Sequence, residues 1–327
     1  LHRVDRRQRQ MCIRDSISAM KNVGKVRNQG LEITLNTTNI KTKHFTWTSN
    51  FNIAFNRNKV LALSENQTAL LTSAQFDQNF NSQSSYIAKV GHSMGAMYGY
   101  IYEGTYKLDD FNKSGNSYTL KSNVPYYTSE ANTQPGMPKY RDLNDDGVIN
   151  TNDCTFIGNG LPTHTGGFTN NFNYRDFDFS FFFQWSYGND VLNANRLMFE
   201  SSWNRTRELN QFASYADRWT IDNPTSNIPR ATSSSSNRVF SSRIIEDGSF
   251  LRLKTLTLGY TVPRKAISRV GIDQLRIYFA AQNLFTISNY SGYDPEVSIR
   301  ESALTPGLDF SAYPRARSFS FGINLGF

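Results

Sequence analysis

The end of the chain shows the clearest pattern of apolar and polar positions. Residues 319–327 place an apolar side chain at every odd position and a small or polar one at every even position, and they end on Phe327. A period of two over this length predicts a strand with one apolar and one polar face. A final strand also leaves an unpaired edge unless another strand covers it. A transmembrane β-barrel meets both conditions, because lipid covers the apolar face and the edge closes on the first strand.

The same alternation recurs along the chain and predicts an all-β fold with about eight antiparallel barrel strands. An even number would place both ends of the segment on the same side of the membrane. Nine stretches show the alternation, of which 86–90 is the weakest; they are residues 31–35, 45–56, 86–90, 97–106, 167–174, 177–187, 250–262, 275–281 and 319–327.

The stretch 250–262 breaks the pattern. Leu251 and Leu253 fall on one face of a regular strand, whereas the apolar residues from Leu256 onward fall on the other. A bulge near Thr255 would bring both groups onto one face. A strand that rises out of the bilayer would also explain the change of phase.

The connections between the expected strands alternate in length. Short turns in the periplasm and long loops outside the cell are typical of outer-membrane barrels. Roughly half the chain would then be extracellular loop, where binding functions tend to lie. The expected short connections are 38–43, 91–95, 175–176 and 263–273, and the long ones are about 58–83, 108–164, 190–249 and 288–316.

Composition agrees with a barrel that has a polar interior. Of the 327 residues, 38% are hydrophobic but 14% are aromatic, and the mean hydropathy is −0.52. Few aliphatic and many aromatic side chains suit a polar lumen, an apolar outer band and aromatic girdles. No run approaches the roughly 18 apolar residues that a membrane-spanning helix needs, which excludes a helical membrane protein.

The net charge of +8 does not indicate a nucleic-acid partner. Five Arg and two Asp within residues 1–16 account for three of the eight net charges. The remaining charges are scattered and form no basic stripe, which is typical of solvated loops and a polar lumen.

Residues 6–16, Arg-Arg-Gln-Arg-Gln-Met-Cys-Ile-Arg-Asp-Ser, resemble the in-frame translation of a common transposase-based sequencing adapter. We therefore interpret residues 1–16 as adapter-derived and assign residues 17–327 to the protein, the alternative being a natural basic arm. Cys154 is then the only native cysteine, so no disulfide can form within the chain. No signal peptide is visible, and for a membrane barrel this predicts a native N-terminus further upstream.

Residues 142–153 fit the calcium-loop pattern D-x-[DN]-x-[DN]-G. Hard oxygen ligands suit Ca²⁺, and Gly147 at the sixth position permits the sharp turn. The twelfth position departs from the helix-loop-helix pattern, because it is Asp and not Glu. An Asx-rich turn that holds its own backbone would explain the same residues without a metal. The predicted ligands are Asp142, Asn144, Asp146, the Val148 carbonyl, Asn150 and Asp153.

The sequence does not indicate catalysis or a zinc site. The four histidines are far apart and share no ligand spacing, and no nucleophile with a base or pair of converging acids suggests an enzyme. The segment 190–249 instead carries Trp203 and Trp219 among many Asn and Arg. Aromatic faces with amides suit the binding of a sugar or peptide, although packing among the loops would explain them too.

Short motifs follow one another from residue 22 onward. They are residues 28–32, 140–153, 156–158, 161–162, 166–168, 245–254, 281–285 and 291–297. Each motif is weak alone, but their order over nearly the whole chain resembles TonB-dependent receptors, and in particular their SusC-like, RagA-like branch.

This resemblance implies the C-terminal third of a roughly 22-stranded barrel with a plugged lumen. It implies import of oligosaccharides or peptides across the outer membrane, driven by the TonB complex beneath a SusD-like surface lipoprotein, with outer-membrane lipid around the barrel. The plug and the segment that contacts TonB would lie upstream of residue 17. Phe327 and its strand would serve as the signal for membrane assembly.

Two alternatives remain open. An outer-membrane receptor barrel would hold a partner with its loops and not transport it. A soluble secreted β-domain would bury the same aromatic residues between two stacked sheets. Uptake of a labelled substrate tests the first alternative, and solubility without detergent tests the second.

Overall fold

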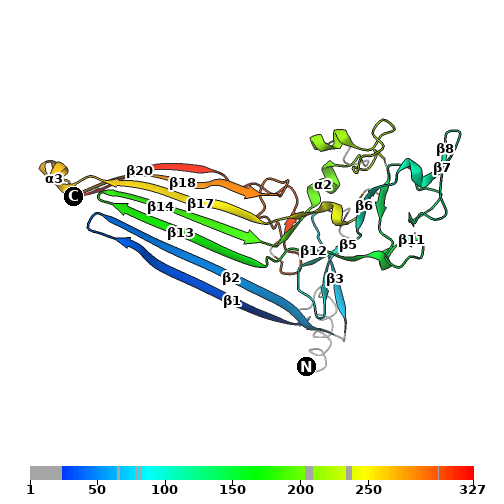
Figure 1. Cartoon of the computed structure of the whole chain (residues 1–327), viewed down its shortest axis with the longest axis horizontal. Coiled ribbons are helices and arrows are strands. Elements are labelled where there is room, and N and C mark those ends of the chain that lie inside the picture. The colour runs from blue at the N-terminus through cyan, green and yellow to red at the C-terminus, as the bar shows by residue number, and fades with distance from the viewer. Residues whose placement is uncertain are drawn as a thin grey trace, which may run out of the picture.

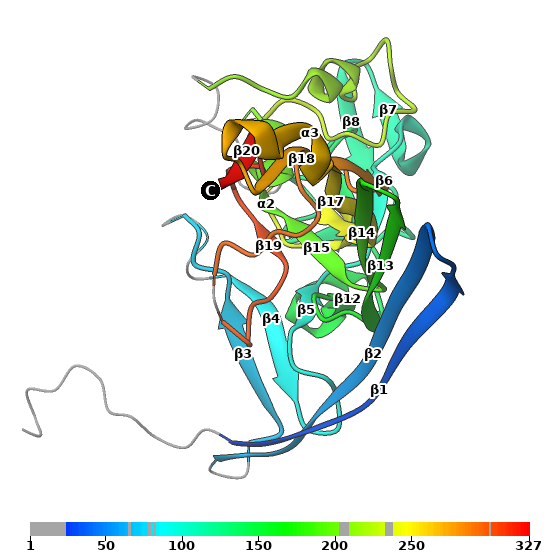
Figure 2. The ribbon, with the colours of Figure 1, turned by 90° about the vertical axis from the view of Figure 1, so that its left-hand side faces the viewer.

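The computed structural model describes residues 24–64, 67–77, 80, 83–202, 209–232, 238–300 and 302–327. Its largest element is one antiparallel sheet of seven strands, which follow each other in space in the order of the sequence (Figure 1). These strands are β1 (Gly24–Lys41), β2 (Phe45–Leu63), β13 (His164–Tyr174), β14 (Phe177–Tyr187), β17 (Phe250–Thr261), β18 (Gln274–Ser288) and β20 (Ser318–Gly326). The predicted all-β, antiparallel fold is confirmed. Seen from one end, the strands follow an arc from β20 to β1 (Figure 2).

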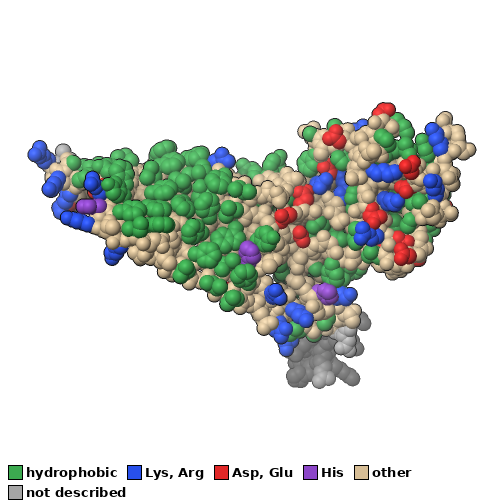
Figure 3. All heavy atoms as spheres, in the orientation of Figure 1, with side chains coloured by type: hydrophobic (Ala, Val, Ile, Leu, Met, Phe, Trp, Pro, Cys, Tyr) green, Lys and Arg blue, Asp and Glu red, His purple; other side chains and the backbone are tan. Residues whose placement is uncertain are grey.

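Cross-strand register brings the apolar positions of the seven strands onto one face of the sheet. Leu31 of β1 and Phe321 of β20, at the two edges, are 59% and 83% exposed. Figure 3 shows hydrophobic side chains as a nearly continuous field over the strands. A surface of this extent requires a nonaqueous neighbour. One row of paired residues across the sheet is Leu35, Phe51, Phe168, Phe183, Leu253 and Phe285.

The bulge predicted near Thr255 is confirmed. The pairing of β17 with both neighbouring strands shifts between Leu253 and Thr255, so Lys254 stands outside the ladder. The shift places Leu253 and Leu256 on the same face, where each lies opposite a phenylalanine of β14. A regular strand would turn one of these leucines to the polar face.

The opposite face of the sheet is polar, as the alternation predicts. Asn50 of β2 donates to an asparagine of β1, and Lys254 donates to Gln184 Oε1 at 2.5 Å. Arg276 donates two hydrogen bonds to the Asp178 carboxylate, at 3.0 and 2.6 Å. These paired polar groups suit a hydrated interior surface.

Short turns join the strands at one end of the sheet, and long connections leave the other end (Figure 1). The short turns are 42–44, 175–176 and 262–273, and the long connections are 64–163, 188–249 and 289–317. The predicted asymmetry of connection length is confirmed. Because the sheet has seven strands, Gly24 starts β1 at the long end and Gly326 ends β20 at the short-turn end. The expectation that both ends lie on one side is therefore wrong.

The strands expected at 86–90 and 97–106 lie outside the seven-stranded sheet. The first coincides with β4 and the start of the second with β5, in a sheet of the order β12 (Thr155–Asn159), β5 (Ala96–Gly99), β4 (Ser84–Lys89) and β3 (Ala69–Ser73). The rest of 97–106 is β6 (Tyr102–Thr105), which pairs with β10 (Pro138–Tyr140) in a separate two-stranded sheet. Four successive side chains of β4, from Ser85 to Ala88, are buried, whereas a barrel strand exposes every second one. The turn 91–95 is consequently not a turn between membrane strands, and one connection runs from 64 to 163.

The three long connections pack into one body at their end of the sheet (Figures 1 and 2). All three contribute to its main apolar core, for example Met97 from the first, Leu197 from the second and Leu308 from the third. This core contains no residue of the seven long strands. The body also contains β6 (Tyr102–Thr105), β7 (Phe111–Ser114), β8 (Ser117–Leu120), β9 (Tyr126–Tyr127), β10 (Pro138–Tyr140), β11 (Val148–Ile149), β15 (Asp190–Asn193), β16 (Ile245–Asp247) and β19 (Leu308–Asp309).

Helices are few and short in the part of the chain that the structure describes. The α-helices there are α2 (Ala194–Phe199) in the body and α3 (Arg264–Ile267) in the turn 262–273. Single 3₁₀ turns lie at Leu108–Asp110, Thr151–Asp153, Ala213–Asp217, Ser242–Ile244 and Ser268–Val270. None of the helices that the structure describes combines the length and apolar character needed to cross a membrane.

Candidate binding cleft

A cleft of about 510 Å³ opens on the body where β15, α2 and the third long connection meet. Its walls combine amides, hydroxyls and aromatic rings. Residues of the second and third long connections line it, among them Asn193, Asn195, Phe199, Phe212, Tyr293 and Tyr313. The cleft is thus a product of how the connections pack together.

Aromatic rings form the apolar part of the cleft. Tyr293 and Tyr313 are 88% and 93% exposed, and the rings of Phe199 and Phe212 lie with centroids 5.5 Å apart. Exposed flat rings can stack on a sugar ring or an apolar peptide side chain. Neighbouring amides can bind hydroxyl or peptide groups.

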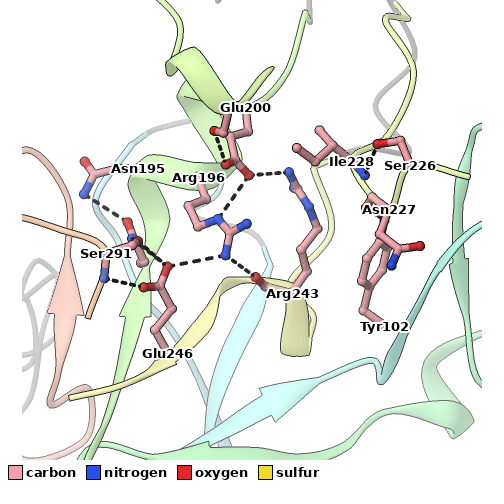
Figure 4. Close-up of polar contacts among 12 residues, drawn as sticks. Tyr102, Asn195, Arg196, Glu200, Ser226, Asn227, Ile228, Arg243, Glu246 and Ser291 are labelled. Carbon is pink, nitrogen blue, oxygen red and sulfur yellow. Dashed lines mark hydrogen bonds and ion pairs between the residues drawn. The ribbon is translucent and has the colours of Figure 1, made fainter. Parts of the chain in front are cut away.

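Glu246 of β16 holds the polar side chains of the cleft in place (Figure 4). Asn193 Nδ2 donates to Glu246 Oε1 at 3.0 Å, and Ser291 donates from its backbone N and its Oγ at 2.8 and 2.9 Å. Asn195 Nδ2 donates to Asn193 Oδ1 at 3.2 Å. Asn195 Oδ1 accepts from the backbone N of Ser311 at 2.7 Å. The amides are therefore preorganised and not free to rotate.

An ion-pair network lies beside this layer (Figure 4). Glu200, which directly follows α2, is buried and pairs with Arg196 at 3.0 Å and Arg243 at 2.6 Å. Ser214 Oγ donates to the same carboxylate at 2.7 Å, and Arg196 also reaches Glu246 at 3.4 Å. A buried carboxylate requires such partners. The network ties α2 to the segment that leads into β16.

Tyr290 and Asp309 form a second polar pair, and Asp309 lines the cleft. Tyr290 Oη donates to Asp309 Oδ2. Burial raises the pKa of Tyr290 above its ordinary value, and the hydrogen bond to Asp309 and the charge of Asp309 raise it further. Tyr290 therefore keeps its proton at neutral pH and remains a hydrogen-bond donor.

Arg252 of β17 fastens the third long connection to the sheet. Its side chain is 2% exposed and donates to Asp294 Oδ1 at 2.5 Å and Glu296 Oε2 at 2.9 Å. Arg315 pairs with Glu296 at 3.2 Å. We name these four residues the Arg252 clamp. The clamp fixes the chain next to Tyr293 and so helps to place one wall of the cleft.

The structure does not bring the two predicted tryptophans together in this cleft. Trp203 lies outside the described residues. Trp219 is buried and lines a separate cleft of about 370 Å³ with Arg218 and Arg230. Its ring covers Gly136, which has a φ of +80° and no space for a side chain. Trp219 packs within the body, and its contact with a substrate stays a prediction.

The predicted calcium loop forms a turn that its own backbone holds. Asp142 and Asp146 each accept from a backbone N–H further along the loop, at 2.7 and 2.8 Å. Asp153 is buried, and its two oxygens accept from the backbone N–H groups of Leu143 and Asn150 at 2.9 and 2.8 Å. Within the described ranges, no three His, Cys, Asp or Glu side chains are grouped to hold a metal ion. A metal ligand at the twelfth position would require Asp153 to leave this cap, and calcium binding stays a prediction.

Phe327 lies directly after β20, at the short-turn end of the sheet. Its side chain is exposed. An exposed terminal aromatic at this end is compatible with a role in membrane assembly, which stays a prediction.

The architecture by itself defines a class of protein. A curved sheet with one exposed apolar face, short turns at one end and a body with a cleft at the other is a segment of a β-barrel wall with its loops. No protein-family model matches the chain.

Comparison with known proteins finds similarity to TonB-dependent receptors. The chain is 34% identical over 316 residues to TonB-dependent receptor P26 of Formosa agariphila, and this match covers 95% of the chain and 30% of the relative. It is 27% identical over 311 residues to TonB-dependent receptor SusC of Bacteroides thetaiotaomicron, covering 94% of the chain and 27% of the relative. The solved structure of the RagAB peptide transporter has the same fold, with a TM-score of 0.73 and 22% identity over 96% of this chain and 31% of that chain.

The homologues of this chain are thus TonB-dependent receptors, SusC among them, and the chain corresponds to a part of such a receptor. It spans about 30% of the length of the relatives that it matches.

Proposed function

We propose that this chain supplies part of the barrel wall and the extracellular loops of a TonB-dependent transporter in the outer membrane. The observation that carries the proposal is the exposed apolar face shared by seven strands, which ends at a body with a cleft. The similarity to TonB-dependent receptors supports it.

The apolar face has the height of the apolar band of a membrane barrel. On β13 and β14 it runs from Tyr174 and Phe177 at one end to His164 and Tyr187 at the other. About ten residues of strand rise about 33 Å, and a tilt of about 45° reduces this height to about 24 Å, near the typical ~25 Å band. Ring pairs stand at both ends, Phe177 with Tyr260 at 4.6 Å and His164 with Tyr187 at 5.0 Å. They match the aromatic girdles of such barrels.

In this arrangement the short turns face the periplasm and the body faces the exterior. A SusD-like surface lipoprotein would cover the cleft from outside and deliver substrate to it. The TonB complex would act through parts of the receptor other than this chain. Phe327, at the periplasmic end, would present the assembly signal.

The proposed substrate is an oligosaccharide or a peptide, because exposed rings and fixed amides share one cleft. A receptor barrel that binds without transport is the alternative. Uptake of labelled oligosaccharides and peptides by cells that express the intact receptor, with and without functional TonB, tests the proposal. We expect uptake that requires TonB. Binding without uptake in both strains would support the alternative, and a receptor that is soluble without detergent would overturn both.

Calcium is proposed as a ligand of the loop 142–153 on the sequence pattern alone. Titration of Ca²⁺ into the intact receptor, followed by calorimetry, tests it. We expect a heat of binding that Asp142→Asn abolishes. Absence of heat from the unmodified receptor would leave the loop as an Asx turn.

A further inference from the structure

Three cations extend the apolar face of β1 and β2 beyond its last aromatic residue. β13 begins at His164, which pairs with Phe55 of β2, whereas β2 continues eight residues further to Leu63. Two and four residues past Phe55, on the same side of β2, stand Arg57 and Lys59. On β1, Arg27 lies directly opposite Lys59. We name Arg27, Arg57 and Lys59 the rim cluster.

The rim cluster points away from the polar side of the sheet. Side chains alternate between faces, so these residues share the side of Leu31 and Phe55. The residues that alternate with the cations on β2 face the other side of the sheet. There Asn58 Oδ1 accepts from the backbone N of Met94 at 2.8 Å, and Val60 is buried. The three cations are exposed.

These like charges stand close together, and no counter-ion accompanies them among the described residues. Residues paired across two strands have Cβ atoms about 4.5–5.5 Å apart, and like charges so placed repel each other. Arg57 lies about 7 Å along the strand from Lys59. The structure shows no ion pair or side-chain hydrogen bond between the rim cluster and any residue that it describes. Gln29, opposite Arg57, adds an amide donor at the same place.

The depth of the rim cluster matches a lipid headgroup layer. Arg57 and Lys59 lie about 7 and 13 Å along β2 from Phe55, and a tilt of about 45° places them about 5 and 9 Å beyond the apolar band. The polar layer on each side of a bilayer is roughly 5–8 Å thick, so the backbone of Arg57 lies within it and that of Lys59, with Arg27 opposite, lies at its outer boundary. Long Lys and Arg side chains can extend back from there into the layer. Figure 3 shows Lys and Arg side chains gathered at the end of the hydrophobic field near β1 and β2.

We propose that the rim cluster binds the phosphate of an anionic lipid headgroup in the leaflet next to the body. Arginine guanidinium groups form paired hydrogen bonds to phosphate, and a bound phosphate would relieve the repulsion among the three cations. The inference rests on the proposed function only for the placement of the sheet in a membrane.

The test uses the intact receptor in a neutral detergent, titrated with phosphatidic acid and followed by native mass spectrometry. The variant carries Arg27→Gln, Arg57→Gln and Lys59→Gln. The matched control carries Lys41→Gln, Lys43→Gln and Arg175→Gln, which remove the same charge from the opposite end of the sheet. We expect the rim variant to bind phosphatidic acid at least about tenfold more weakly and the control to stay within about twofold of the unmodified receptor. Phosphatidylcholine should not compete, and added salt should weaken binding.

Equal weakening in both variants, or no weakening in the rim variant, would overturn the proposal. Inorganic phosphate that competes as strongly as the lipid would show a general anion site and overturn it too. Should the triple variant not fold, Arg57→Gln and Lys59→Gln alone should each weaken binding about threefold. This measurement requires no transport, so its failure and a failure of TonB-dependent uptake are observed separately.

Discussion

At the scale of single residues, the apolar face contains a polar group that its neighbours satisfy. Asn170 of β13 is buried on this face, and its Oδ1 accepts from Trp47 Nε1 at 2.8 Å and Ser49 Oγ at 2.6 Å. Asn39 of β1 continues the chain by donating to Ser49 Oγ at 2.6 Å. An unpaired polar group in hydrocarbon is unfavourable by several kcal/mol. These bonds explain how a lipid-facing surface accommodates polar side chains.

Asn170→Ala should destabilise the barrel, because it leaves the Trp47 N–H and the Ser49 hydroxyl without their acceptor. We expect a loss of about 1–3 kcal/mol in the free energy of unfolding, measured by equilibrium urea unfolding of the intact receptor in detergent. The control is Asn171→Ala, the next residue, which lies on the polar face opposite Ser180. Its effect should stay within about 0.5 kcal/mol. Similar losses from both variants would contradict the role of Asn170.

Asp190 predicts a dependence of stability on pH. Burial raises its pKa above 3.8, the charge of Asp247 adds to this, and a hydrogen bond from the backbone N of Asn159 opposes it. A carboxyl whose folded pKa exceeds its unfolded value destabilises the folded state once the pH has risen through that interval. Asp190→Asn should therefore raise Tm at pH 7.5, and the gain should shrink toward pH 3, where both states are protonated. The exposed control Asp222→Asn should leave Tm unchanged at both pH values, whereas an equal gain from Asp190→Asn at both would refute the explanation.

At the scale of elements, alternation identifies a strand where one face is apolar and the other polar. The predicted strand 177–187 coincides with β14, and 319–327 differs from β20 by one residue. At the beginning of β1 and the end of β2 the strand pairing continues although the apolar pattern has stopped. The rim cluster takes the outward positions there. Alternation also assigns β4, β5 and β6 to the barrel, because buried strands of the body carry apolar residues too. Periodicity alone does not reveal which sheet a strand joins.

Loss of the Arg252 clamp should release the third long connection. Arg252→Met leaves Asp294 and Glu296 with Arg315 as their remaining cation and removes their hydrogen bonds to Arg252, which should reduce stability by about 1–3 kcal/mol. We expect faster limited proteolysis within residues 289–317 and a lower Tm of the intact receptor. The control is Arg264→Met, whose pair with Asp273 at 2.6 Å is exposed and should contribute at most about 1 kcal/mol. Equal protease resistance of the two variants would argue against the clamp.

At the scale of the whole molecule, the sheet follows from the sequence pattern but the body does not. Asn195 and Ser311 are joined across the cleft by a hydrogen bond although 116 residues separate them. Irregular connections carry no period from which such an approach could be inferred. Residue type alone therefore suggests Trp219 as a substrate-binding residue. Tyr313 lies in no motif, and the motif that contains Tyr293 assigns it no role. The aromatic residues of the cleft come together only when the second and third long connections pack against each other.

The exposed rings of the cleft predict how strongly it binds substrate. Tyr293→Ala with Tyr313→Ala removes two exposed rings without disturbing the core, so Tm should not change. Each ring contact is worth roughly 0.5–1.5 kcal/mol, and the double variant should bind the proposed oligosaccharide or peptide substrate about tenfold more weakly in calorimetric titration. Tyr293→Phe with Tyr313→Phe keeps the rings and should retain most of the affinity. Trp219→Ala, in the separate cleft, provides the comparison. If it abolishes binding while the double alanine variant binds normally, the substrate site lies around Trp219 and not in the cleft beside α2.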